Sequence, residues 1–491
     1  MSGAGAEGRR WEPVIGLEVH AQLRTRTKLF SSAPNDFGAA PNSRTNEVDL
    51  GMPGVLPVLN AKAFELAVRA ALALGCQVHP VSIFARKHYF YPDLPKGYQI
   101  SQYEEPFATG GAVPIELDGD PAEIALTRIH MEEDAGKLIH DPGITGGATS
   151  HVDLNRAGVP LIEIVSEPDL CSPEQAGAYL RSLRSILRYI DASDADMEKG
   201  NFRCDANVSV RRAGERELGT KVELKNLNSF RFVERALAYE IERQIDVLEE
   251  GGSIVQETRL WDDRTGATRA MRTKEYAHDY RYFPDPDLVP ICLDAGWIDA
   301  RRRELPELPA AKRRRYVEEL GLPPQDARQL TEDREIAGFF EETLKIHPHP
   351  KTVANWVMRN LLEVVSESDR SLEELPLTPV HLAELLALVD SGRLTAASAR
   401  KLLPEIARSG TDPETLMRAQ GLEAVSDVGE LEGMAREVLD ANADQVAKYQ
   451  AGEEKLFHFF VGQIMRRTRG KASPGVVRQV LQRLLDDRRG S

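Results

Sequence analysis

Cysteine is scarce in this 491-residue sequence, and long apolar runs are missing. The four cysteines lie far apart without a Cys-x-x-Cys pair, which argues against a disulfide framework and a local thiolate zinc site and suits a reducing cytosol. No apolar run reaches the roughly 18 residues that span a bilayer, and residues 1–13 contain no hydrophobic stretch typical of secretory signals. We therefore expect a cytoplasmic protein without membrane contact.

An excess of positive charge is also missing. The chain carries 62 basic and 77 acidic residues, a net charge of −15. A protein that merely coats nucleic acid needs the opposite balance, so any nucleic-acid contact must come from a local basic patch. His-Glu-x-x-His, Gly-x-Ser-x-Gly and P-loop motifs are absent, and no cysteine has a nearby histidine that would make it a nucleophile.

The composition is that of an ordinary globular protein, and the length suggests about three domains. Apolar residues make up 42% and charged residues 28%, and one domain is expected per roughly 150 residues. The first part, to about residue 295, mixes short strands with helices, which predicts an α+β fold with a largely antiparallel sheet. Alternating patterns bounded by turn residues predict strands at Val14–Leu23, Ile124–Met131, Leu161–Val165, Asn201–Arg211 and Thr220–Leu224.

Helix signals divide the chain further. In the first part, helices are predicted from Ala61 to Leu74, from Ser172 as N-cap with Pro173 at the first position, and from near Asn228 to Gly251-Gly252. After Pro290 almost every segment has helical periodicity, with a weaker interruption at Ser409–Pro413. We predict three domains: a catalytic domain at 1–295, followed by two all-α domains at 296–410 and 411–491.

Several predicted strands have one apolar and one polar face. Alternate residues of a strand share a face, so Glu18 and His20 point together, away from the apolar side chains of their strand. Arg203 and Asp205 share the polar face of a later strand. Glu163 interrupts an apolar run, where a lone buried charge would be costly without a cation or arginine partner.

The same residue types recur on these faces. Carboxylates, one histidine and basic residues beside Asn and Ser are the groups that hold Mg²⁺ and bind phosphates. The pattern predicts metal-assisted phosphoryl transfer on an antiparallel sheet. The alternative is that these are solvated faces of an ordinary sheet.

Eight longer segments give a more specific indication. In order along the chain they are Val14–His20, Tyr89–Tyr103, His130–Lys137, Asp153–Arg156, Leu161–Asp169, Arg203–Asn207, Glu223–Phe230 and Asp279–Asp287. With these segments, and with Val461–Met465 near the C-terminus, the whole chain resembles the B subunit of bacterial aspartyl/glutamyl-tRNA amidotransferases.

The resemblance implies a ligase that acts in protein biosynthesis. Members of this family work in a heterotrimer with an amidase-type glutaminase A subunit and a small C subunit, and they bind misacylated Glu-tRNA(Gln) or Asp-tRNA(Asn). They use ATP and Mg²⁺ to phosphorylate the side-chain carboxylate, which ammonia from the A subunit then amidates. The family's catalytic fold resembles glutamine synthetase and guanidino kinases.

The resemblance also implies functional residues. Glu18, His20, Glu133 and Glu163 are expected to be catalytic and to bind metal, with Glu132 and Asp205 as further metal-site residues. Mainly from their strand faces and charges, we also expect Arg203, Lys225 and Asn226 to bind ATP phosphates or the substrate carboxylate. Some members carry a four-cysteine zinc knuckle, but Phe30–Pro34 and Thr45–Asp49 contain no cysteine, so we expect no zinc.

The C-terminal segment supplies the local basic patch. Residues 461–491 contain eight Lys/Arg and two acidic residues, a composition that suits phosphate contacts. We expect tRNA binding by Arg466, Arg467, Arg469 and Lys471. A solvated basic helix end is the alternative interpretation of this run.

Two other functions compete with the ligase prediction. The chain could be a non-catalytic tRNA-docking scaffold, or a stand-alone amide ligase that uses free ammonia on a small metabolite. The long helical C-terminal part argues against the second, since a small substrate needs no such extension. The sequence leaves open which misacylated tRNA is the physiological substrate.

Overall fold

The computed structural model describes residues 10–117, 119–139, 149–271, 280–368, 370–424, 428–468 and 471–488. It separates into two compact units, Met1–Ala310 and Ala311–Ser491, called here the sheet unit and the helical unit. None of the described helices is long and apolar enough to cross a membrane.

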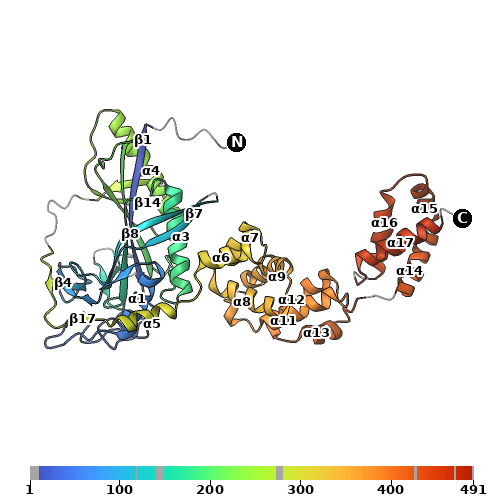
Figure 1. Ribbon diagram of the computed structural model, residues 1–491, viewed down its shortest axis with the longest axis horizontal. Coiled ribbons are helices and arrows are strands. Elements are labelled where there is room, and N and C mark those ends of the chain that lie inside the picture. The colour runs from blue at the N-terminus through green and yellow to red at the C-terminus, as the bar shows by residue number, and fades with distance from the viewer. Residues whose placement is uncertain are drawn as a thin grey trace. The chain divides into compact units, whose positions relative to one another are not determined.

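A large, twisted sheet forms the framework of the sheet unit (Figure 1). Its strand order is β15-β14-β13-β12-β1-β11-β8-β5-β4-β16. Along this order β13 and β14 pair in parallel, and the other described neighbours are antiparallel. The described strands are β1 (Trp11–Gln22), β2 (Gln77–Val78), β3 (Val81–Ser82), β4 (Ala85–His88), β5 (Tyr98–Ser101), β6 (Ala108–Thr109), β7 (Ala112–Leu117), β8 (Asp120–Glu133), β9 (Lys137–Ile139), β10 (His151–Asp153), β11 (Pro160–Ser166), β12 (Phe202–Arg212), β13 (Val222–Lys225), β14 (Thr258–Asp262), β15 (Ala267–Ala270), β16 (Phe283–Pro284) and β17 (Ile291–Cys292).

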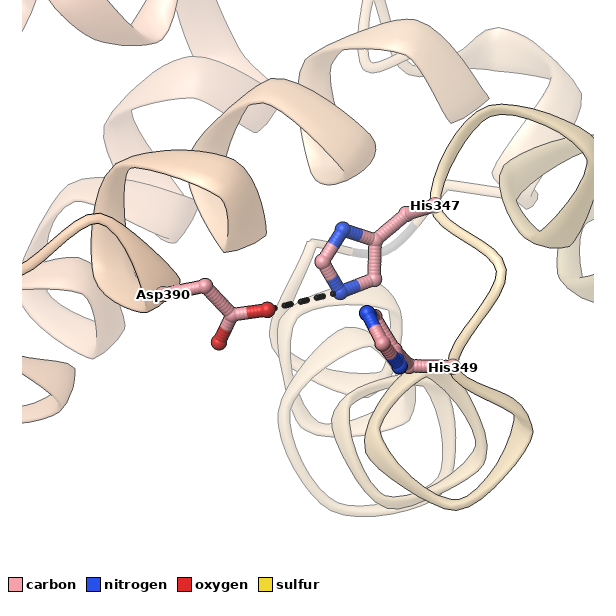
Figure 2. Close-up of side chains that lie close together, drawn as sticks. All are labelled: His347, His349 and Asp390. Atoms are coloured by element: carbon pink, nitrogen blue, oxygen red, sulfur yellow. Dashed lines mark ion pairs between the residues drawn. The ribbon is translucent and has the colours of Figure 1, made fainter.

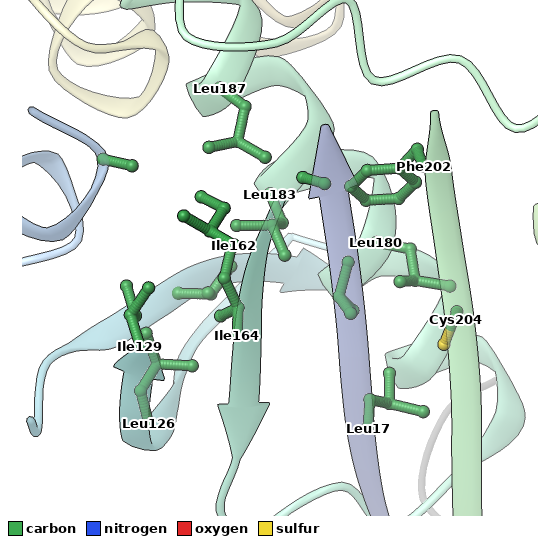
Figure 3. Close-up of a cluster of buried hydrophobic side chains, with 14 of the residues drawn as sticks. Leu17, Leu126, Ile129, Ile162, Ile164, Leu180, Leu183, Leu187, Phe202 and Cys204 are labelled. Carbon is green, nitrogen blue, oxygen red and sulfur yellow. The ribbon is translucent and has the colours of Figure 1, made fainter. Parts of the chain in front are cut away.

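Helices cover the apolar face of this sheet. The described helices of the unit are α1 (Ala61–Ala73), α3 (Pro173–Tyr189), α4 (Phe230–Glu249) and α5 (Ala295–Arg303), and α6 (Pro309–Glu318) begins at its end. Figure 3 shows Leu17 of β1 and Phe202 of β12 beside Leu180 and Leu183 of α3 in one buried cluster. Because one face of each strand is fixed in this core, the alternate side chains must point to the opposite, polar face.

The helical unit contains two separate apolar clusters. The first joins helices from α6 to α13, and the second joins α14 to α17. The described helices are α7 (Pro324–Leu330), α8 (Arg334–Ile346), α9 (Pro350–Trp356), a π-helical turn (Val357–Leu361), α10 (Leu362–Glu367), a 3₁₀ turn (Leu372–Glu374), α11 (Pro379–Asp390), α12 (Ala396–Ser409), α13 (Pro413–Ala419), α14 (Val428–Ala441), α15 (Ala443–Gln450), α16 (Leu456–Arg467) and α17 (Pro474–Asp487).

The predicted fold class is confirmed at the level of an α+β unit with a mostly antiparallel sheet and a helical C-terminal part. All five predicted strands exist with ends shifted by a few residues, and Ser172 caps α3 by accepting a hydrogen bond from the Gln175 amide. The three-domain division stays a prediction. The structure itself divides at residue 310, and Leu416 and Met417 of α13 pack in the first helical cluster.

Candidate functional site

The polar face of the central strands carries the predicted site residues. β1 lies between β11 and β12, so that His20 is directly opposite Glu163 on one side and Arg203 on the other. On the far side of β11, His130 of β8 is opposite Glu163. Directly opposite residues of neighbouring strands share a face at about 5 Å, so this register aligns four polar side chains in one row.

Three members of this face form a compact cluster, called here the sheet cluster: His20, Glu132 and Glu163. Each offers one ligand atom, and these atoms all lie within 4.8 Å of one another. His20 Nε2 lies 3.1 Å from a Glu163 oxygen and 3.7 Å from a Glu132 oxygen. One imidazole and two carboxylates at this spacing make a donor set suited to a divalent cation.

Burial opposes the ionisation of both carboxylates of the sheet cluster. Burial raises the pKa of Glu132, with His20 opposing and Glu163 reinforcing that rise. Burial also opposes the ionisation of Glu163, but the hydrogen bond with His20 and the neighbouring His130, His20 and Lys87 lower its pKa overall. Burial acts to lower the pKa of His20, yet its bond to Glu163 and the two carboxylate charges raise it. A cation between the two carboxylates, either a proton on His20 or a metal ion, would offset the cost of burying both in ionised form.

Glu18 and Asp205 extend the acidic surface beside the sheet cluster. They are directly opposite each other on β1 and β12, and the Asn207 amide donates to Glu18 at 3.0 Å. Burial raises the pKa of Glu18, and the charges of Glu163, Asp205 and Glu223 raise it further. The structure therefore places both predicted residues next to the cluster.

Glu133 takes a different direction from the one expected. Consecutive residues of a strand face opposite sides, so Glu132 and Glu133 cannot both enter the cluster from β8. Glu133 instead forms an ion pair with Lys96 and accepts a hydrogen bond from the Ile100 amide at 2.9 Å. The expectation that Glu133 shares the metal site with His20 and Glu163 does not match this geometry, whereas Glu132 does.

The predicted phosphate-binding residues lie on or beside the same face, but each has an internal partner. Arg203 binds Asp134 through two hydrogen bonds of 3.0 Å, and Lys225 contacts Asp205 at 3.1 Å. Asn226 has a positive φ of 66° and donates to the Trp261 carbonyl at 2.9 Å. Its side-chain amide is thus engaged in holding the turn after β13.

Two residues of the site were not found from the sequence. His130 is buried, with Nε2 3.7 Å from Glu163, and burial lowers its pKa to about 4, so that its ring is neutral at pH 7. Lys87 of β4 interacts with Glu132 and Glu163, which raise its pKa against the effect of burial. His130 lies two residues before Glu132, so the period of a strand was a usable signal, whereas no local signal places β4 near this face.

The predicted tRNA-binding residues fall into three groups. Arg467, the last residue of α16, forms an ion pair with Glu437 at 2.8 Å. Arg466 and Lys471 have no ion pair within the described ranges. Arg469 lies outside the described residues. Part of the basic charge near the C-terminus is therefore already neutralised within the helical unit.

Comparisons with known proteins cover both units. A family model described as "GatB/GatE catalytic domain" matches residues 13–299, and one described as "GatB domain" matches residues 338–485. A protein of Geotalea daltonii, named as the B subunit of an aspartyl/glutamyl-tRNA(Asn/Gln) amidotransferase, is 56% identical over 97% of this chain and 99% of its own length. The proteins of the same name from Geotalea uraniireducens and Persephonella marina are 55% and 53% identical, again over 97% of this chain.

The chain belongs to the family of amidotransferase B subunits. The resemblance inferred from the motifs is thereby confirmed, including its extension over the whole chain. The family's catalytic-domain model spans every residue of the sheet cluster, together with Glu18, Arg203, Asp205 and Lys225. The site formed by these strands thus lies inside the segment that matches the model described as the family's catalytic domain.

Proposed function

We propose that this chain carries out ATP-dependent transamidation of misacylated tRNA. In this reaction the side-chain carboxylate of Glu-tRNA(Gln) or Asp-tRNA(Asn) is phosphorylated and then amidated by ammonia. The observation that carries the proposal is the cluster of His20, Glu132 and Glu163, with ligand atoms within 4.8 Å, inside a segment that matches the family's catalytic domain. The related fold of glutamine synthetase and guanidino kinases, expected from the resemblance, remains part of this proposal.

The chemistry explains why a metal and cations are needed. A carboxylate is a poor electrophile, and phosphorylation gives it a leaving group that ammonia can displace. His20, Glu132 and Glu163 would hold Mg²⁺, with Glu18 and Asp205 adjacent. Their donor set fits because burial, reinforced by neighbouring carboxylates, raises the pKa of Glu18 and of Glu132, and a bound cation would favour their ionised forms. When bound, Mg²⁺ supplies charge neutralisation for the phosphoryl group that is transferred.

The basic residues of this face then orient the anionic substrates. Asp134 fixes the guanidinium of Arg203, and Asp205 and Glu223 hold the ammonium of Lys225 at 3.1 and 3.2 Å. Because these partners set each cation's position, little side-chain entropy remains to be lost when an anion binds. Lys87 is a third cation for the same surface.

The decisive experiment offers the purified complex each misacylated tRNA with ATP and Mg²⁺ and scores amide formation. We expect ATP hydrolysis that depends on the misacylated tRNA and falls by at least about 100-fold in Glu163→Gln, while the partner's glutaminase activity survives. Glu167→Gln, which changes the residue directly after β11, is the matched control. Full turnover by Glu163→Gln would favour a docking scaffold and reject the catalytic assignment.

The ammonia source is a separate part of the proposal. We infer that an amidase-type A subunit, in a heterotrimer with a small C subunit in the cytoplasm, delivers ammonia within the complex. Most free ammonia is protonated near neutral pH and is then not nucleophilic, so a sheltered path raises its useful concentration. Glutamine should support amidation far better than an equal concentration of ammonium at pH 7, and equal efficiency would contradict internal delivery.

The helical C-terminal part is proposed to bind the tRNA body. The basic side chains near the end of α16 support this, with Arg466 and Lys471 the better candidates because Arg467 is paired with Glu437. Removing residues 428–491 takes away the whole apolar cluster of α14 to α17, and α13 stays packed in the first helical cluster. This deletion should raise the KM for tRNA strongly without affecting glutaminase activity.

Point variants test the tRNA contact more finely. Arg466→Ala and Lys471→Ala should weaken tRNA binding. Each should also reduce the slope of the logarithm of the binding constant against the logarithm of salt concentration by about one. Arg467→Ala should have a smaller effect because its charge is already neutralised. Binding that is insensitive to salt and to the deletion would move the tRNA contact elsewhere.

A further inference from the structure

A second group of potential metal ligands lies in the helical unit, far along the chain from the sheet cluster. It consists of His347, His349 and Asp390, called here the helical cluster (Figure 2). Their ligand atoms also lie within 4.8 Å of one another, and His347 Nε2 is 3.3 Å from an Asp390 oxygen. Nothing in the proposed transamidation uses these residues.

The helical cluster is mounted on a well-packed scaffold. His347 follows α8, His349 precedes α9, and Asp390 is the last residue of α11. α8 packs against both α9 and α11, and apolar residues of all three helices belong to the same buried cluster. The backbone at the three positions is therefore held by packing, while the exposed side chains of His349 and Asp390 can still rotate.

The imidazole of His347 is buried and turned into the cluster. The residue is 7% exposed, and its Nε2 is among the buried polar atoms without a hydrogen bond. The 3.3 Å ion pair with Asp390 does not give this buried nitrogen a hydrogen bond, and a buried polar atom without one is costly. Figure 2 shows this nitrogen facing Asp390, with the ring of His349 beside it.

Two of the three helix ends around the helical cluster, those of α8 and α11, also favour a cation. α8 and α11 both end there, and the carbonyl ends of helices carry partial negative charge. Asp390 adds a full negative charge at such an end, where an acidic residue is unfavourable. His349 stands at the N-cap of α9 without making a side-chain capping bond, so its imidazole is not used by the helix.

We propose that His347, His349 and Asp390 bind a divalent transition-metal ion of the Zn²⁺ class and so fasten the α8–α9 loop to the end of α11. Two imidazoles and one carboxylate suit Zn²⁺, whereas Mg²⁺ and Ca²⁺ prefer oxygen ligands. Ligand atoms around tetrahedral Zn²⁺ are about 3.3 Å apart, a spacing that His347 and Asp390 already have. The expectation of no zinc rested on missing cysteines in Phe30–Pro34 and Thr45–Asp49 and does not bear on this histidine site.

The test measures Zn²⁺ binding by the full-length chain in excess Mg²⁺, by titration calorimetry and by the visible absorption of bound Co²⁺. We expect one Zn²⁺ equivalent that persists in Glu163→Gln, in which the sheet cluster has lost a ligand. His349→Ala and Asp390→Ala should each weaken this binding by more than about 10-fold, since losing even an outer-shell partner of a metal ligand typically costs about 10–100-fold. His458→Ala, an exposed histidine of the same unit, should leave it unchanged.

Folding is controlled in the same experiment. His349 and Asp390 are exposed, and their variants should match the wild-type circular dichroism and melting temperature when a chelator is present. Zn²⁺ should then raise the melting temperature of the wild type and of His458→Ala more than that of His349→Ala at the same Zn²⁺ concentration. The proposal is overturned if His349→Ala binds Zn²⁺ as tightly as the wild type, or if Glu163→Gln abolishes all Zn²⁺ binding.

Discussion

The sheet unit and the helical unit each gather histidine and carboxylate side chains, but they do so by different means. In the sheet unit the ladder between β1 and β11 sets His20 opposite Glu163. In the helical unit the cluster is formed by the ends of α8 and α11 and the start of α9, with Asp390 more than forty residues from His347 in the chain. The pairing of two strands fixes which side chains are neighbours on one face of the sheet. Helix ends that pack together instead bring into contact the residues that begin or end those helices.

The two clusters also differ in composition and surroundings. The sheet cluster has two carboxylates and one imidazole, and it is flanked by Glu18, Asp205 and several cations. The helical cluster has two imidazoles and one carboxylate. Oxygen-rich sites favour Mg²⁺ and imidazole-rich sites favour Zn²⁺. The difference teaches that a histidine–carboxylate cluster must be interpreted from its ligand ratio and neighbours, not from its mere presence.

The strongest test of this comparison separates Glu132 from Glu133. Glu132→Gln should lower transamidation by at least about 100-fold and raise the Mg²⁺ concentration needed, because it removes an oxygen from the sheet cluster. Glu133→Gln should leave the Mg²⁺ requirement unchanged. It should instead cost about 2–4 kcal/mol of stability, since it breaks the ion pair that the buried Glu133 forms with the partly buried Lys96. Mg²⁺ titrations of the rate and denaturant unfolding measure the two effects, and a reversed result would restore Glu133 to the metal site.

Glu132 and Glu133 also show how far sequence reasoning reached. Strand alternation correctly put Glu18 with His20, and Arg203 with Asp205, on the polar faces of their own strands, because the apolar side chains of each strand fix its orientation. The pairing of β1 with β12 then joins the two faces. Alternation could not choose between two adjacent carboxylates near a strand end. That choice depends on where β8 stops and on its register with β11, which is set by tertiary pairing.

Other parts of the site carried no usable local signal. Lys87 reaches the polar face because its strand, β4, pairs with β5 in the sheet. The four residues of β4 do not indicate by themselves that β5 is their neighbour. The two histidines of His347-Pro348-His349-Pro350 were not singled out from the sequence, and their acidic partner Asp390 is brought to them only by the packing of α8 on α11. Periodicity therefore predicted the elements and their faces, and long-range packing decided which faces meet.

The next prediction compares ion pairs inside the two units, beginning with the buried one. Asp134 accepts hydrogen bonds from Arg203 and from Gln22 at 2.7 Å, and Asp134→Asn leaves Arg203 without its bidentate partner. We expect a loss of about 2–4 kcal/mol, measured by denaturant unfolding at pH 7. Asp194→Asn, which removes an exposed contact with Arg24, is the control and should cost less than about 1 kcal/mol.

The Asp134 pair has a definite pH signature. Burial acts to raise the pKa of Asp134, but Arg203 and Arg156 outweigh it and hold the pKa below its usual value. A lowered folded-state pKa gives stability that is complete above the unfolded value of about 3.9 and is lost as pH falls through the folded value. The wild type should therefore lose more stability than Asp134→Asn when the pH falls from 5 to 3, and equal losses would contradict the assignment.

The smallest effect is expected for the corresponding pair in the helical unit. Glu341 of α8 contacts Lys312 of α6 at 2.8 Å and also pairs with Arg315, and these cations lower the pKa of Glu341 against the effect of burial. All three side chains are partly exposed, so Glu341→Gln should cost only about 0.5–1 kcal/mol. Hydrogen exchange resolved by peptide should show the loss in α6 and α8 and not in the sheet unit. Glu342→Gln, which removes only an exposed pair within α8, is the matched control and should change exchange less. If Glu341→Gln lowered the free energy of unfolding as much as Asp134→Asn does, solvent exposure would not explain the difference in stability expected between the ion pairs of the two units.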